Sequence, residues 1–69
     1  MRISARNCLK GTITSITKGP VNSEVVIDIG NGTLITSIIK NHAVDNLRLK
    51  AGHEAYEVIK SSDVMIAVE

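Results

Sequence analysis

Two short polar stretches of the sequence combine cationic and neutral hydrogen-bond donors. Near the N-terminus, Ser4-Ala5-Arg6-Asn7 offers a hydroxyl, a guanidinium, a carboxamide and a run of backbone N–H groups, with no acidic residue among them. Near the other end, Lys60-Ser61-Ser62 offers an ammonium, two hydroxyls and further N–H groups. A set of donors suits a fully ionised oxyanion, which can only accept hydrogen bonds. We predict that the two stretches meet across a subunit boundary to bind such an anion.

The donor chemistry narrows the class of anion. A tetrahedral dianion that stays unprotonated at neutral pH needs donors only, whereas phosphate keeps a proton part of the time and gains from an acceptor. A donor-only site therefore favours molybdate, tungstate or sulfate, and cavity size would separate the first two from sulfate. From spacing alone, the favoured alternative is that Ser4–Asn7 is a polar lead-in to the first strand, so the site needs support from the rest of the chain.

The length of the chain indicates one domain, spanning residues 1–69, that associates with itself. A chain of 69 residues hides only about 60% of the surface that its unfolded form exposes, so its isolated core is marginal. Cys8 is the only cysteine, which excludes an intrachain disulfide and a thiolate zinc site. Apolar residues make up 43% of the sequence, so we expect part of the apolar surface to lie between subunits.

Charge and hydropathy argue against two kinds of partner. The formal net charge of +1 does not provide a strongly electropositive surface for nucleic acid. No apolar run approaches the ~20 residues of a membrane span, and no apolar stretch of a signal peptide follows the opening residues. With a single free thiol besides, we expect a cytoplasmic protein that contacts neither nucleic acid nor membrane.

The pattern of Ile and Val predicts an all-β fold, because β-branched side chains fit pleated sheet. Five strands and a short helix are expected, at Leu9–Thr17, Val21–Ile29, Thr33–Lys40, His42–Leu47 (the helix, with Asn41 as its N-cap), Glu54–Lys60 and Asp63–Val68. This order predicts a small five-stranded OB-type barrel with the helix between strands 3 and 4, and an SH3-like or Sm-like barrel is the main rival.

Alternation predicts which side chains face the core. In the first strand Leu9, Gly11, Ile13 and Ser15 share one face, and Gly11 marks a bend. Gly30-Asn31-Gly32 predicts a tight hairpin, because its residues tolerate positive φ.

Two further elements carry apolar side chains that need cover. In the helix, Ala43, Val44 and Leu47 are expected to turn inward. Leu34 and Ile38 lie on the second face of the third strand, which another subunit would cover most simply.

Catalysis has little support in this sequence. His42 and His53 lie in a short helix and a turn, and neither has an obvious nucleophile near it in the chain. The acidic residues are scattered, without the spacing of a metal or glycosidase site. Single-stranded nucleic acid, a common partner of OB-type barrels, needs stacking aromatics, and Tyr56 is the only aromatic residue. We therefore expect a binding protein that is not an enzyme and holds no organic cofactor.

The whole chain resembles the molbindins, the small molybdenum-pterin-binding proteins of the TOBE type. The resemblance is carried by Ile3-Ser4-Ala5-Arg6-Asn7 with Leu9-Lys10-Gly11, by Val25-Val26-Ile27, by Ile35-Thr36-Ser37-Ile38-Ile39 and by Val58-Ile59-Lys60-Ser61-Ser62-Asp63-Val64-Met65. It implies a single TOBE domain of OB type, assembled as a homohexamer (a trimer of dimers). It also implies molybdate or tungstate bound at subunit interfaces as oxyanion cargo, for intracellular molybdenum storage or homeostasis.

The resemblance also assigns residues to two oxyanion sites. At the first site Ser4, Ala5, Arg6 and Asn7 would act from one subunit, with Lys60 and Ser61 closing the pocket from another. At the second site, near the symmetry axis, the candidates are Lys18, Gly19, Val21, Asn22 and Ser37. No protein side chain would ligate a bare metal ion, because the metal arrives as its oxyanion. The alternative function is an anion-sensing module that docks to a regulator or transporter; a single-stranded nucleic-acid-binding module has less support.

Overall fold

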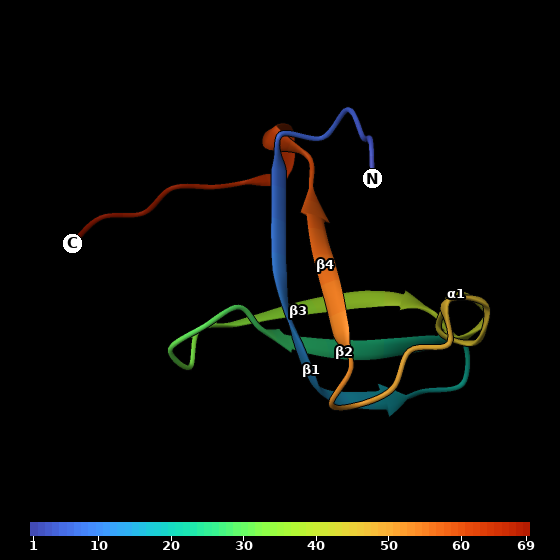
Figure 1. Cartoon of the computed structure of the whole chain (residues 1–69). Coiled ribbons are helices and arrows are strands. Elements are labelled where there is room, and N and C mark those ends of the chain that lie inside the picture. The colour runs from blue at the N-terminus through green and yellow to red at the C-terminus, as the bar shows by residue number, and fades with distance from the viewer.

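The computed structural model describes all residues, 1–69, and its centre is one antiparallel sheet of four strands in the order β3-β2-β1-β4 (Figure 1). The elements in chain order are β1 (Asn7–Lys18), β2 (Asn22–Asp28), β3 (Leu34–Lys40), α1 (Asn41–Leu47), β4 (Glu54–Ile59) and the 3₁₀ helix η1 (Ser61–Asp63). The prediction of an all-β class with one short helix after the third strand is confirmed. The helix has seven residues, and no helix of this chain is long enough to cross a bilayer.

β1 is the strand around which the sheet curls. Its first half, Asn7–Thr12, pairs with β4, and its second half, Thr12–Lys18, pairs with β2 (Figure 1). The change of partner falls at Thr12, next to Gly11. A Cβ added at Gly11 would collide with the carbonyl oxygen of Asp28 and lie 2.6 Å from Ile27 Cγ2. Glycine is therefore required because β2 passes too close for any side chain, which supports the predicted bend.

A bulge at Thr14 overturns part of the predicted face of β1. Ile13 pairs with Ile27 and Ser15 with Val26, so Thr14 is an extra residue on its strand. Beyond the bulge the alternation shifts by one position, because the side-chain period of a strand is two. Ser15, predicted to share the face of Ile13, is exposed, and Ile16 packs against the core instead.

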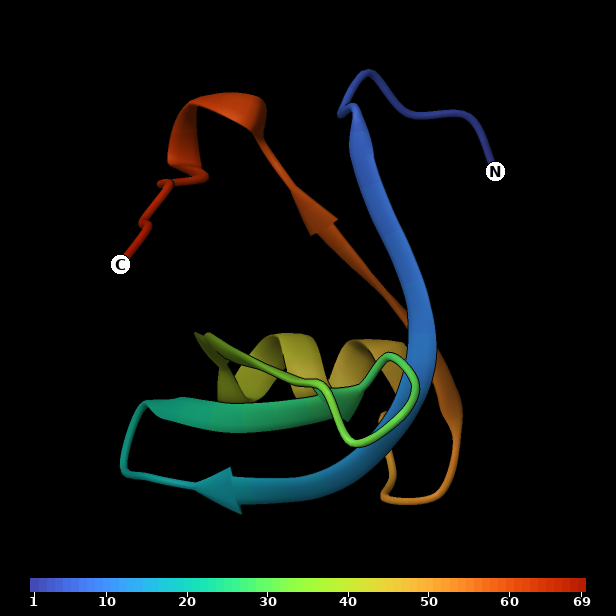
Figure 2. The same cartoon turned by 90° about the vertical axis from the view of Figure 1, so that its left-hand side faces the viewer.

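The core is small and lies on the concave side of the curled sheet, where α1 covers it (Figure 2). Its four buried residues are Ile13, Val25, Ile27 and Val44. Val44 is the inward residue of α1, as predicted, but Leu47 is 67% exposed. Six buried residues in the whole chain are few, and large apolar side chains remain at the surface.

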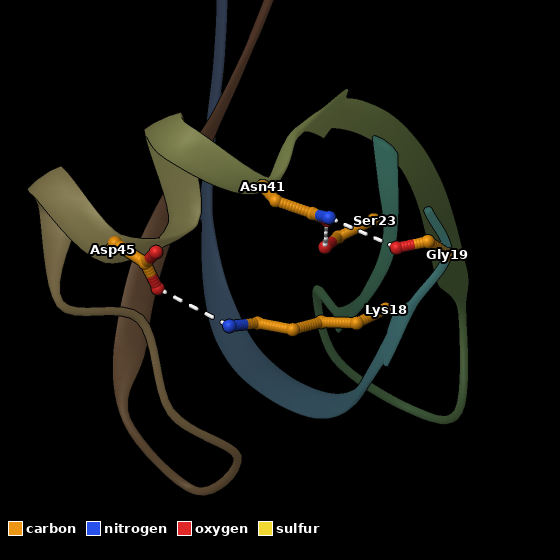
Figure 3. A network of polar contacts seen from close by, with 5 residues as sticks. All are labelled: Lys18, Gly19, Ser23, Asn41 and Asp45. Carbon is orange, nitrogen blue, oxygen red and sulfur yellow. Dashed lines mark hydrogen bonds and ion pairs between the residues drawn. The ribbon is translucent and has the colours of Figure 1, made fainter. Parts of the chain in front are cut away.

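Asn41 holds the β1–β2 turn to the start of α1, which differs from its predicted role as N-cap. Lys40 is the N-cap, and Asn41 is the first residue of the helix. The Asn41 carboxamide donates from Nδ2 to the Gly19 carbonyl at 2.9 Å and accepts a hydrogen bond from the Ser23 hydroxyl (Figure 3). Its backbone N–H donates to the Val21 carbonyl, so these bonds fix the turn rather than the helix terminus.

The hairpin between β2 and β3 has the predicted conformation. Gly30, Asn31 and Gly32 all have positive φ, at 124°, 54° and 75°. The Asp28 carboxylate accepts the Gly30 N–H at 2.8 Å, which closes the turn.

The predicted fifth strand, Asp63–Val68, is wrong for the single chain. Ser61–Asp63 form η1, and the residues after it run away from the sheet without pairing (Figures 1 and 2). Ile66 and Val68 are 90% and 91% exposed. The alternation of apolar residues predicted a strand, but a strand forms only where an edge is available to pair with it. The sheet therefore has four strands and remains open.

Candidate functional site

The two donor-rich stretches lie at the same end of the sheet within one chain. Asn7 begins β1 and Ile59 ends β4, and the two residues are register partners. Asn7 Nδ2 also donates to the Ile59 carbonyl at 3.3 Å. Because the strands are antiparallel, Ser4–Arg6 leads into the pair and Lys60 leaves it, so both stretches project from one end (Figure 1).

Apart from the Asn7 carboxamide, the donors of these two stretches are not used within the chain. No backbone hydrogen bond involves the N–H groups of Ser4, Ala5 or Arg6, nor those of Ser61 or Ser62. The chain has two ion pairs, Lys10–Glu54 and Lys18–Asp45, and neither includes Arg6 or Lys60. The backbone N–H groups and the two cations are thus free to bind an anionic ligand from solvent.

The acidic residue nearest to this set in sequence is Asp63. Its N–H donates to the Lys60 carbonyl at 2.9 Å, which turns the chain through η1. The Asp63 side chain is exposed and forms no ion pair with Arg6 or Lys60. Its carboxylate therefore does not neutralise either cation in the single chain.

The residues predicted for a second site do not all come together. Lys18, Gly19, Val21 and Asn22 lie in and beside the β1–β2 turn, where Lys18 Nζ lies 3.2 Å from Asp45 Oδ1 (Figure 3). The carbonyl groups of Gly19 and Val21 accept hydrogen bonds from Asn41. Ser37 instead lines an apolar groove on the concave side of the sheet, away from this turn.

That groove is a feature that sequence reasoning missed. It measures about 560 Å³, and ten of its thirteen lining residues are apolar. Glu57 lies in it, 7% exposed, and burial raises the pKa of its carboxyl above the usual value. Sequence reasoning counted Glu57 among scattered acids. The signal was its place between Ala55 and Ile59, because residues two apart on a strand share a face.

Other candidate chemistry remains dispersed. No three His, Cys, Asp or Glu side chains gather where they could hold a metal ion. Cys8 is an exposed free thiol on β1. His42 Nε2 lies 3.1 Å from Asn46 Nδ2 on the exposed side of α1, and this pair includes no nucleophile.

Comparison with known proteins matches residues 3–66 to the TOBE domain family. The chain belongs to the TOBE domain family. Over its full length it is 51% identical to the whole of a probable molybdenum-pterin-binding protein of Haemophilus influenzae. The predicted resemblance is confirmed.

Two solved structures place this TOBE domain among proteins of the same fold. MopII from Clostridium pasteurianum superimposes with a TM-score of 0.91 at 49% identity, covering 97% of this chain and 100% of that one. The cytoplasmic molybdate-binding protein ModG, solved with molybdate bound, superimposes with a TM-score of 0.90 at 48% identity. The match covers 94% of this chain and 46% of the ModG chain. This TOBE domain therefore spans about half of the ModG chain and all of MopII.

Proposed function

We propose that this TOBE domain is a cytoplasmic, non-enzymatic binding protein that takes up molybdate or tungstate as oxyanion cargo, for molybdenum storage or homeostasis. The observation that carries the proposal is the register pair Asn7–Ile59, which gathers Ser4–Arg6 and Lys60–Ser61 at one end of the sheet with their donors unused. Similarity to ModG, which was solved with molybdate bound, supports the choice of anion.

Each residue of the first site has a distinct physical role in this proposal. Arg6 and Lys60 supply two positive charges, which balance the two negative charges of the anion. Ser4 and Ser61 supply hydroxyl donors, and backbone N–H groups around Ala5 complete the set. Asn7 positions the site by tying the start of β1 to the end of β4. A donor-only shell selects an unprotonated dianion, because a protonated oxygen would meet no acceptor.

The site is proposed to be completed by assembly, with the anion bound between subunits of a hexamer built as a trimer of dimers. The exposed segment after η1 supports self-association, since Val64, Ile66 and Val68 alternate as in a strand but pair with nothing in their own chain. We propose that this segment becomes the fifth strand on the sheet of a second copy. Its apolar side chains would then fill the open groove and close the OB-type barrel.

A second anion site near the symmetry axis is proposed for the β1–β2 turn. Lys18, Gly19, Val21 and Asn22 are its candidates within one subunit, and Ser37 would join them only from a neighbouring copy. The Lys18–Asp45 ion pair would have to open for Lys18 to contact an anion. The Lys18 and Asp45 side chains are 55% and 67% exposed, so opening the pair costs about 1 kcal/mol or less.

Native mass spectrometry with metal analysis tests the function and the assembly together. Protein dialysed against molybdate is expected to appear as hexamers carrying molybdenum, and tungstate is expected to displace it. Sulfate and phosphate at equal concentration serve as controls and are expected to bind more weakly. A protein that carries no molybdenum after dialysis, or as little molybdate as phosphate, would refute the proposed function.

A further inference from the structure

Glu57 places a carboxyl group in a groove that is otherwise apolar. It lies on the inner face of β4, opposite Leu9 of β1 and between Ala55 and Ile59 of its own strand. The residue is 7% exposed, and its Oε1 is a buried side-chain atom without a hydrogen-bond partner. A charged carboxylate in such a place loses its hydration and gains nothing in return.

Glu57 forms no ion pair. The other titratable groups that line the groove are Glu54, Tyr56 and the amino terminus at Met1. The Glu54 carboxylate lies 3.4 Å from Lys10 Nζ on the exposed side. The neighbouring elements contribute only uncharged side chains, namely Ile13, Val25, Ile27, Ser37, Ile39, Leu47 and Leu49. Burial alone therefore raises the pKa of the Glu57 carboxyl, because no neighbouring charge acts on it.

The segment proposed to enter this groove has the same sign of charge as an ionised Glu57. Residues 63–69 include Asp63 and Glu69 but no lysine or arginine. Seating them on the groove would remove the remaining water from Glu57 and bring negative charge toward it. A protonated Glu57 has neither penalty, and its O–H can donate to a backbone carbonyl of the incoming strand.

We propose that protonation of Glu57 controls the closure of the groove by the C-terminal segment of a second copy, so that assembly takes up a proton. The inference rests on the assembly described under the proposed function. Association is strongest below the pKa of Glu57 in the free chain. It weakens as the pH rises from there through the higher pKa of the assembled form, because the free chain then binds fewer protons than the assembly. Between the two pKa values, the dissociation constant rises at most about tenfold per pH unit for each Glu57 that the assembly buries.

Sedimentation velocity over a dilution series at several pH values tests the inference, in urea where needed to bring dissociation into range. The wild-type dissociation constant is expected to rise at least about tenfold from about pH 5 to about pH 8. Glu57→Gln keeps the shape of the protonated side chain and is expected to assemble tightly at both pH values. Glu54→Gln removes an exposed carboxylate from the same strand and is expected to keep the wild-type pH dependence.

Two results would overturn the inference: a wild-type assembly that does not weaken with rising pH, or a Glu57→Gln assembly that weakens as much as wild type. If circular dichroism shows that Glu57→Gln does not fold, Glu57→Leu takes its place and is expected to assemble tightly at both pH values. If neither variant folds, the inference is also overturned. Molybdate binding is measured separately by calorimetry. A wild type that is monomeric at every pH would overturn both the proposed assembly and its control by Glu57. The calorimetry would still show whether the monomer binds molybdate.

Discussion

Asn7 and Ile59 face each other where β1 and β4 end, and the Asn7 carboxamide donates to the Ile59 carbonyl at 3.3 Å. This one pair joins two stretches separated by more than fifty residues of chain. It brings the backbone donors before β1 and the cation after β4 to the same end of the sheet. The anion site proposed for this TOBE domain depends on that alignment.

Asn7→Asp is expected to weaken molybdate binding at least tenfold, or by about 1.4 kcal/mol. The substitution keeps the size of the side chain but removes the Nδ2 donor to Ile59 and adds a negative charge beside the anion. Titration calorimetry measures the loss. Asn46→Asp adds the same charge to the exposed side of α1 and serves as the control. Equal affinity in the two variants would remove Asn7 from the site.

Gly11→Ala is expected to destabilise the fold by about 1–3 kcal/mol, because the added Cβ collides with the Asp28 carbonyl and forces β1 and β2 apart. Thermal unfolding at one fixed protein concentration measures the effect as a lower melting temperature. Thr12→Ala, at an exposed neighbouring position, is expected to change stability by less than about 0.5 kcal/mol. A melting temperature unchanged in Gly11→Ala would show that β1 can bend without the close approach.

The second and third strands show how much of the fold could be predicted from local pattern. Val25 and Ile27 are buried and alternate with less buried neighbours, and Gly30-Asn31-Gly32 tolerates the positive φ values of a tight turn. Both signals are contained within a few residues, so the strands and the turn were both predicted. The structure places both donor stretches at one end of a single chain, and their meeting across a subunit boundary stays a prediction.

Features that depend on distant partners could not be predicted in this way. The bulge at Thr14 is a relation between β1 and β2, and no residue of β1 alone indicates it. The segment after η1 has a strand's alternation, but alternation does not say whether the pairing edge belongs to the same chain. Glu57 is a different case: an acid within a strand pattern suggests a solvent-facing position, although its place between Ala55 and Ile59 puts it on the inner face of β4.

Ile66→Asp is expected to abolish assembly while leaving the monomer folded. Ile66 is 90% exposed in the single chain, so a charge at this position does not disturb the core of the monomer. The same charge would be buried at the proposed contact with a second copy. Sedimentation velocity should show monomers where the wild type is expected to form hexamers, and circular dichroism should be unchanged. Ala67→Asp adds the same charge on the other face of the segment and is expected to retain more assembly. A hexamer of Ile66→Asp would show that the segment lies outside the subunit contacts.

Lys60 is the unpaired cation that follows β4, and titration calorimetry of molybdate into Lys60→Ala shows whether it binds the oxyanion. A charge-assisted hydrogen bond contributes about 1.5–3 kcal/mol, so the dissociation constant should rise at least about tenfold. Lys50→Ala removes an exposed lysine from the loop between α1 and β4 and should bind like the wild type. A Lys60→Ala variant that binds molybdate as tightly as Lys50→Ala would contradict the account.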